Sequence, residues 1–335
     1  MLLNPAILAL VLVSAVIGLM LLLASAFAIQ LLREWDITSG SELQLRMERR
    51  TYLISTLLFW ALSSELISLV LFVYNAESMS GQFVGAMCAT GVLNVNMWGW
   101  PTLFLKIAIF FSGTIWLALN YLDNKGIDYP LVKIKYTLLL LMAPMVVAEF
   151  YLQLNYFLAM NPDVITSCCG SLFSVDAEGV AAEVSSLSPR QAVIALYGSG
   201  LVVMVSGSWT LIRKSGGVLF ALASAGAFIG ALVSIVSYLS LYIYEHPHHH
   251  CPFCILKSGH GYAGYALYIP LFLATSLSLA ASVVSVWKGV PSLSRAVEVD
   301  LPKLAFSALV MFTIFYTLSA WVVWQSNLTM GSVWW

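Results

Sequence analysis

Eight long apolar runs dominate this chain and limit it to folds made of whole buried or embedded helices. Each run is near or above the ~20 residues that an α-helix needs to cross ~30 Å of hydrocarbon. The runs lack the period-two alternation of strands, and an open sheet cannot satisfy its backbone in lipid. We therefore predict an all-α polytopic membrane protein, one transmembrane helical bundle over residues 1–335, with eight helices at about 6–32, 52–75, 101–122, 136–159, 191–212, 217–244, 263–287 and 304–325.

The composition supports a membrane location. Hydrophobic residues make up 60% of the chain and charged residues only 9%, whereas a soluble domain carries roughly 25% charged residues. The excess of apolar side chains must face lipid or other apolar helices. The formal net charge of -1 gives no sign of nucleic acid binding, so the lipid bilayer is the expected partner.

The distribution of lysine and arginine predicts the orientation. Twelve of the fifteen cationic residues fall in loops on one side, which the positive-inside rule makes cytoplasmic. Both termini and the loops at about 76–100, 160–190 and 245–262 then lie outside, and we expect them in the periplasm of a bacterial inner membrane. The twelve are Arg33, Arg46, Arg49, Arg50, Lys125, Lys133, Lys135, Arg213, Lys214, Lys288, Arg295 and Lys303.

All five cysteines fall in the three predicted outer loops. They are Cys88 in the first, Cys168 and Cys169 in the second, and Cys251 and Cys254 in the third. The outer side is the oxidising side in bacteria, where disulfides persist. Because neighbouring cysteines rarely bond each other, we expect Cys88 to pair with Cys168 or Cys169. The alternative is one structural bridge and one leftover thiol.

The Cys251-Pro-Phe-Cys254 motif is the sharpest chemical signal. Such a C-x-x-C pair is either a reactive dithiol or a static disulfide that pins the loop. We expect Cys251 to be the more reactive thiol, with a lowered pKa, at the N-cap of a short helix starting at Pro252. Cys254 would lie a turn further in and be less exposed.

All five histidines lie within Glu245–Tyr262, beside this motif, and histidine and thiolate at such density suit zinc or copper. The alternative is that they cap a loop at the membrane interface. Attachment of c-type haem is excluded because Ile255, not histidine, follows the second cysteine. With no histidine in a predicted helix, an intramembrane bis-His haem is excluded too. The candidate metal ligands are His246, His248, His249, His250 and His260.

Three charged residues lie well inside predicted helices, namely Glu65, Lys106 and Glu149. Burying them singly would cost several kcal/mol, so we expect Lys106 to contact Glu149 or Glu65. They could form a proton relay or a polar wall for a quinone head group. The alternatives are an ion pair that locks the helices, or a lysine that snorkels outward.

These observations favour an inner-membrane thiol–disulfide oxidoreductase as the first hypothesis. The layout is similar to that of quinone-linked membrane thiol oxidases, which also set cysteine pairs at the outer ends of a helical bundle, and this resemblance implies a quinone cofactor. A periplasm-facing protein that binds or transports copper or zinc is the second hypothesis. The third is a membrane anchor subunit of a redox complex. The corresponding partners are a periplasmic thiol protein or a metallochaperone.

Overall fold

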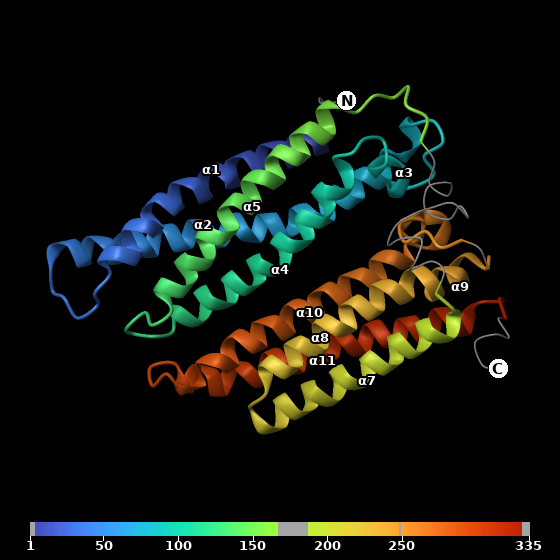
Figure 1. Ribbon diagram of the computed structural model, residues 1–335. Coiled ribbons are helices and arrows are strands. Elements are labelled where there is room, and N and C mark those ends of the chain that lie inside the picture. Colours follow the sequence, from blue (N-terminus) through green and yellow to red (C-terminus); the bar gives the residue numbers. More distant parts are fainter. Residues whose placement is uncertain (1–3, 167–186, 248, 330–335) are drawn as a thin grey trace. The chain divides into compact units, whose positions relative to one another are not determined.

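The computed structural model describes residues 4–166, 187–247 and 249–329, and within these ranges the regular elements are helices (Figure 1). Eight of them are long and apolar enough to cross a membrane, which confirms the predicted number. They are α1 (Pro5–Glu34), α2 (Glu42–Ser78), α4 (Gly99–Asp123), α5 (Val132–Leu158), α7 (Pro189–Arg213), α8 (Gly217–Ser234) with its continuation to Tyr244, α10 (Ala263–Val286) and α11 (Ser294–Gln325).

Two helices begin well before their apolar runs. Helix α2 begins at Glu42 and α11 at Ser294, about ten residues ahead of the predicted starts at 52 and 304. The additional first turns are polar, and in α2 an exposed Arg46–Glu42 ion pair of 3.3 Å spans one turn. Hydropathy locates the part of a helix that suits lipid, but helical hydrogen bonding continues past it into water.

The chain divides into two compact units. Unit 1 comprises residues 1–75, 95–161 and 287–297, and therefore holds α1, most of α2, α4 and α5. Unit 2 comprises residues 76–94, 162–286 and 298–335, with α7, α8, α10 and most of α11. The predicted single bundle over 1–335 stays a prediction, as do the predicted orientation and the location of the termini.

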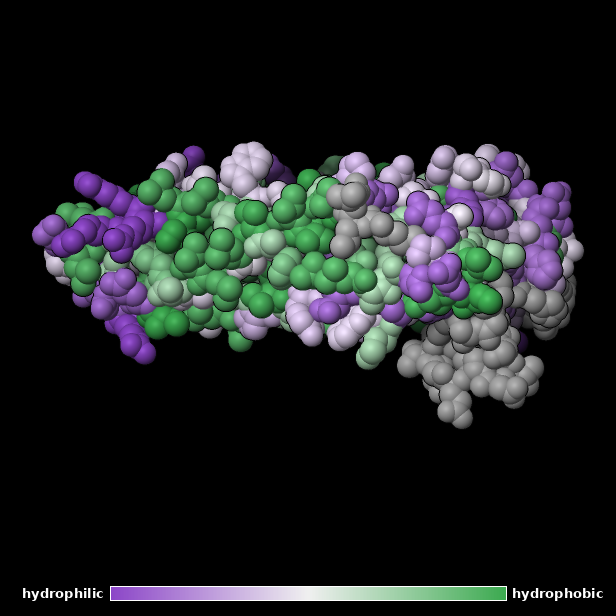
Figure 2. Space-filling view, turned by 90° about the horizontal axis from the view of Figure 1, so that it is seen from above, coloured by the Kyte–Doolittle hydropathy of each residue, from purple (hydrophilic) through white to green (hydrophobic). Residues whose placement is uncertain are grey.

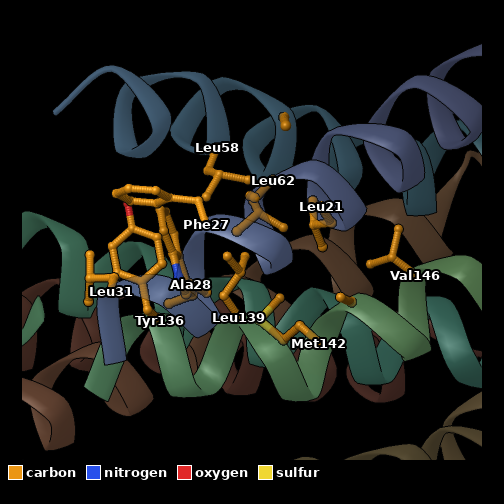
Figure 3. Packing of buried hydrophobic residues seen from close by; sticks show 14 of the residues in the cluster. Leu21, Phe27, Ala28, Leu31, Leu58, Leu62, Tyr136, Leu139, Met142 and Val146 are labelled. Atoms are coloured by element: carbon orange, nitrogen blue, oxygen red, sulfur yellow. The ribbon is translucent and has the colours of Figure 1, made fainter. Parts of the chain in front are cut away.

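The core of unit 1 is formed by apolar side chains from α1, α2, α4 and α5, several of which are labelled in Figure 3. On α5, Leu139, Met142 and Val146 recur at the three- and four-residue spacing of one helix face, and all three are fully buried. The ring of Phe27 on α1 meets Tyr136 on α5 edge to face, with centroids 5.7 Å apart. These contacts hold α1 and α5 together along their length.

The long helices of unit 2 lie side by side (Figure 1). Helices α7 and α8 approach closely at Gly207, where an added Cβ would lie 2.6 Å from the ring of Phe220. After Ser234 the sixth span passes through one π-helical turn, Ile235–Leu239, before the short α9 (Ser240–Tyr244). A π turn leaves backbone carbonyls without their usual helical partner and is frequent near functional sites.

Apolar side chains also cover much of the outer surface. Figure 2 shows hydrophobic residues along the middle of the visible face and hydrophilic residues toward its ends. Leu23, Leu201 and Leu222 expose 67%, 68% and 66% of their surface, an arrangement that would be costly in water along a whole helix. In a bilayer these side chains contact lipid, so the chain is a multi-pass membrane protein.

Candidate functional site

The site in unit 2 starts from Cys88, in the segment between α2 and α4. Cys88 is the N-cap residue of a short helix, α3 (Ala89–Leu93). Its side chain makes no capping bond. The carboxylate of Glu77 accepts a hydrogen bond of 2.8 Å from the Ala89 amide instead. The Cys88 thiol therefore takes no part in capping α3, because Glu77 binds the backbone at the start of this helix.

A second segment, residues 245–262, carries the C-x-x-C motif. It leaves α9 at Glu245, whose positive φ of 52° turns the chain back. Two partly buried phenols then hold its backbone: Tyr244 donates to the carbonyl of Cys251 at 2.6 Å, and Tyr268 of α10 donates to that of Pro252 at 2.9 Å. The loop is therefore fixed by neighbouring helices although it has little regular structure.

These two segments bring three cysteines together. The sulfur atoms of Cys88, Cys251 and Cys254 all lie within 4.8 Å of one another, and those of Cys88 and Cys251 are 3.3 Å apart. Cys88 and Cys251 are fully buried and Cys254 is 6% exposed. The Thr90 hydroxyl is 3.2 Å from the Cys251 sulfur. We call the three cysteines the sulfur cluster.

The environment of Cys251 favours its thiolate. Hydrogen bonds from Cys254 and then Cys88 lower the pKa of Cys251, and smaller contributions from His249 and Thr90 add to them. Burial acts in the opposite direction but is outweighed. The predicted lowering of this pKa is confirmed, and the thiolate is both the nucleophile and the metal-binding form of cysteine.

Two local expectations for the motif are wrong. Pro252 starts no helix: the next regular element is a 3₁₀ turn at Cys254–Leu256 with Phe253 as its N-cap. Cys251 therefore lies outside the turn, and its pKa falls through neighbouring thiols rather than a helix dipole. The expected order of exposure is also reversed, since Cys251 is completely covered and Cys254 retains 6% exposure.

The four described histidines have different surroundings. His249 lies beside Cys251, packs on Tyr244 with ring centroids 4.1 Å apart, and its buried Nε2 atom has no hydrogen-bond partner among the described residues. The Nδ1 atom of His250 donates to the Val236 carbonyl of the π turn at 3.1 Å. His260 also packs on Tyr244, with ring centroids 4.7 Å apart. His246 is exposed.

Burial lowers the pKa of His260, and the nearby His249 and Lys257 add to this effect. At neutral pH His260 is therefore an uncharged ring that packs on Tyr244. Of the five predicted metal ligands, His249 is the one beside the sulfur cluster, and His248 lies outside the described residues.

Cys168 and Cys169 also lie outside the described residues, so their pairing with Cys88 stays a prediction. The last described residue before them, Thr166, bonds to the loop of Cys88: its hydroxyl donates to the Gly91 carbonyl at 2.9 Å. The contact between Cys88 and Cys251 was missed by sequence reasoning, because 163 residues separate them and no local pattern reports so distant a contact.

The predicted intramembrane contact is confirmed in unit 1. The ammonium of Lys106 lies 2.7 Å from a Glu149 oxygen and 3.1 Å from a Glu65 oxygen. We call these three residues the charge cluster. They are 2%, 0% and 3% exposed, so a quinone head group there stays a prediction and would require the helices to part.

A second buried lysine was not predicted. Lys135 was predicted to be a loop cation, but it is 1% exposed and lies in the first turns of α5. Its ammonium is 2.6 Å from Asp123 and 3.2 Å from the side-chain Oδ1 atom of Asn120. The other Asp123 oxygen accepts from the Leu131 amide at 2.8 Å. We call Lys135 and Asp123 the paired charges.

Comparison with protein-family models, with curated proteins and with solved structures finds no match to this chain. The fold and the site define a multi-pass, all-helical membrane protein with a buried three-cysteine cluster between two loop segments.

Proposed function

We propose that this membrane protein binds one thiophilic d¹⁰ metal ion, Zn²⁺ or Cu⁺, at the sulfur cluster. The observation that carries the proposal is the convergence of three buried sulfur atoms within 4.8 Å of one another. Around a tetrahedral ion with metal–sulfur bonds of about 2.3 Å, sulfur atoms lie about 3.8 Å apart. The cluster is therefore already close to the spacing that one shared ion requires.

The donor set selects among metals. Thiolates favour zinc and cuprous copper over hard cations such as magnesium or calcium. The lowered pKa of Cys251 favours the thiolate, the form of cysteine that binds metal. Zinc prefers four ligands, and His249 is the adjacent fourth donor, with a buried nitrogen that lacks a partner among the described residues. Cuprous copper could be held by the three sulfurs alone.

Burial favours a closed site. A catalytic or transporting site keeps an open ligand position, whereas structural sites are enclosed by protein ligands. Because Cys88 and Cys251 are fully covered, we infer that the ion is held in place. It would join the 76–94 segment to the 245–262 loop, two segments that are also linked by the Lys257–Glu77 ion pair of 3.7 Å.

Metal analysis of the purified full-length protein tests this function. We expect about one zinc or copper ion per chain, and its loss in each of Cys88→Ser, Cys251→Ser and Cys254→Ser. His249→Ala should weaken the binding of zinc at least about 10-fold but leave the binding of cuprous copper unchanged. This variant therefore distinguishes the two ions. His246→Ala is the matched control for His249→Ala and should keep the metal. A metal-free protein under reducing, metal-replete conditions would refute the proposal.

Thiol–disulfide exchange is the second candidate, and the Cys88–Cys251 distance of 3.3 Å favours it. Loss of two electrons and two protons to an oxidant such as a quinone would join these sulfurs. The Cys254 thiolate could then attack Cys251 and release Cys88 as a thiolate. Mass spectrometry of the protein isolated without reductant would show this disulfide, and Cys254→Ser would trap it. A complex with a periplasmic thiol protein would additionally require these buried thiols to become exposed.

We propose the periplasmic side of a bacterial inner membrane for this site, on the basis of the cationic bias of the opposite loops. A single added cysteine on each side tests this. Ser258 is exposed in the 245–262 loop, and Ile127 is 95% exposed between α4 and α5. Ser258→Cys should react with a membrane-impermeant maleimide in intact spheroplasts, and Ile127→Cys only after lysis. The reverse pattern would contradict the orientation.

A further inference from the structure

The charge cluster of unit 1 lies deep within its helices. Lys106 is seven residues after Gly99, where α4 begins, and Glu149 is nine residues before Leu158, where α5 ends. At a rise of 1.5 Å per residue these positions lie about 10 and 14 Å inside the helix ends. All three side chains are at most 3% exposed. Water and lipid head groups therefore do not solvate these charges.

The charges within the cluster do not balance if all three groups are ionised. One ammonium faces two carboxylates, Glu65 and Glu149, and among the described residues Lys106 is the only cation that pairs with either of them. The remaining polar neighbours are neutral: the Ser14 hydroxyl donates to Glu149 at 3.5 Å, and Ser68 lies between Lys106 and Glu65. A net charge of -1 would be left in a low-dielectric interior, which is costly.

Two carboxylate oxygens in the cluster also lack partners. The Oε1 atoms of Glu65 and Glu149 both contact Lys106, whereas both Oε2 atoms are buried without a hydrogen bond among the described residues. An ionised carboxylate accepts hydrogen bonds at both oxygens, so these atoms indicate a missing group. A hard metal cation is a poor candidate because it takes six or more oxygen ligands. In the described part of the cluster and its neighbours Ser14 and Gln153, the oxygens without a partner are these two and the Oε1 atom of Gln153.

We propose that Glu65 and Glu149 share one bound proton, so that the charge cluster is a neutral proton-binding site within the membrane-spanning part of unit 1. One carboxyl is then neutral, with its proton on an oxygen that otherwise lacks a partner, and the other remains ionised against Lys106. The proton belongs to the pair rather than to one residue, because the two carboxylates bind the same ammonium.

The groups around the site leave this balance unchanged. From α1 the facing residue is Ser14, which also accepts from Gln153 of α5 at 2.8 Å. From α2 the Phe72 ring lies 5.8 Å from the Lys106 ammonium, and Tyr156 of α5 packs against Phe72 at 5.7 Å. Tyr156 is a neutral phenol at physiological pH, so no second charge enters from these helices.

Infrared spectroscopy of the full-length protein in lipid vesicles tests the proposal directly. A protonated carboxyl gives a C=O stretching band that shifts in D₂O. We expect one such buried carboxyl per chain at pH 7 in the wild type and none in Glu65→Gln or Glu149→Gln. Asp123→Asn, which changes the paired charges and not the charge cluster, is the control and should leave the band unchanged. The signal of Lys106→Met should double, because both carboxyls must then be neutral.

Absence of a protonated carboxyl at pH 7 in the wild type, or a band that survives both glutamate substitutions, would overturn the proposal. Replacing sodium with potassium or choline should leave the band unchanged. A band that appears only when sodium is withdrawn would show that a metal cation, not a proton, balances the cluster. If a glutamine variant fails to fold, the doubled signal of Lys106→Met still decides the question.

Discussion

The sulfur cluster of unit 2 and the charge cluster of unit 1 are both almost fully buried, yet their side chains come from different kinds of segment. The charged residues lie on long helices, which position them through regular backbone hydrogen bonds and apolar packing. The cysteines lie on irregular segments held by side-chain bonds from Glu77, Tyr244 and Tyr268. The helical cluster is preformed, while the loop cluster would gain rigidity from a shared ligand.

The two clusters also differ in what completes them. Within unit 1, the paired charges Lys135 and Asp123 form a neutral one-to-one pair, and the charge cluster needs only a proton to reach the same balance. The sulfur cluster has soft donors, and in the function that we propose a metal ion or, in the second candidate function, oxidation to a disulfide would complete it. The net charge of a buried polar cluster and the softness of its donor atoms thus indicate what kind of partner would complete it.

The largest expected effect is removal of metal from the sulfur cluster. Cys251→Ser should lower apparent metal affinity by more than about 100-fold, because it removes a direct ligand rather than an outer-shell partner. It should also lower the thermal unfolding temperature, since metal binding contributes directly to folding. Calorimetry with and without chelator measures both effects. A chelator that lowers the unfolding temperature of Cys251→Ser as much as that of the wild type would place the metal elsewhere.

The next effect separates the charge cluster from the paired charges. Lys106→Met removes the cation from the one ionised carboxylate of the charge cluster and should destabilise the protein by about 3–5 kcal/mol. Lys135→Met strands only Asp123, which retains its bond from the Leu131 amide, and should cost less. Lys135→Met/Asp123→Asn should recover most of that loss. Denaturant unfolding in detergent micelles measures all three. Equal losses of stability in Lys106→Met and Lys135→Met would contradict the predicted difference between the charge cluster and the paired charges.

A smaller effect should come from the packing behind the sulfur cluster. At Gly264 of α10 an added Cβ would lie 2.7 Å from Leu256 and 2.8 Å from Ile255, in the turn that begins at Cys254. Gly264→Ala should destabilise unit 2 by about 1–3 kcal/mol through overpacking and weaken metal binding. Gly259→Ala, where no atom lies within 4 Å of the new Cβ, is the matched control. Thermal unfolding and metal titration should leave the control unchanged.

The smallest effect concerns the ion pair between the two loop segments. Lys257 and Glu77 are 3.7 Å apart, with side chains 37% and 11% exposed. Lys257→Ala should therefore cost no more than about 1 kcal/mol, as is usual for solvent-exposed pairs. Arg46→Ala, which breaks an exposed pair in unit 1, should behave alike. A large loss of metal in Lys257→Ala would mean that this pair, rather than the sulfurs, holds the loops together.

Much of the molecule follows from local sequence. The eight spanning helices could be predicted because about 20 consecutive apolar residues have no other stable arrangement in lipid. The contact of Lys106 with Glu65 and Glu149 could be predicted from the cost of a lone charge at that depth. In each case the penalty for the alternative is large and depends on composition alone.

Other features depend on tertiary structure. The approach of Cys88 to Cys251 is set by Glu77, Tyr244 and Tyr268, and no periodicity in the sequence encodes their convergence. The burial of Lys135 could not be foreseen either, because a cation at a helix end usually reaches water and only the position of Asp123 draws it inward. Apolar length determines where helices form, whereas distant side chains determine which polar groups meet.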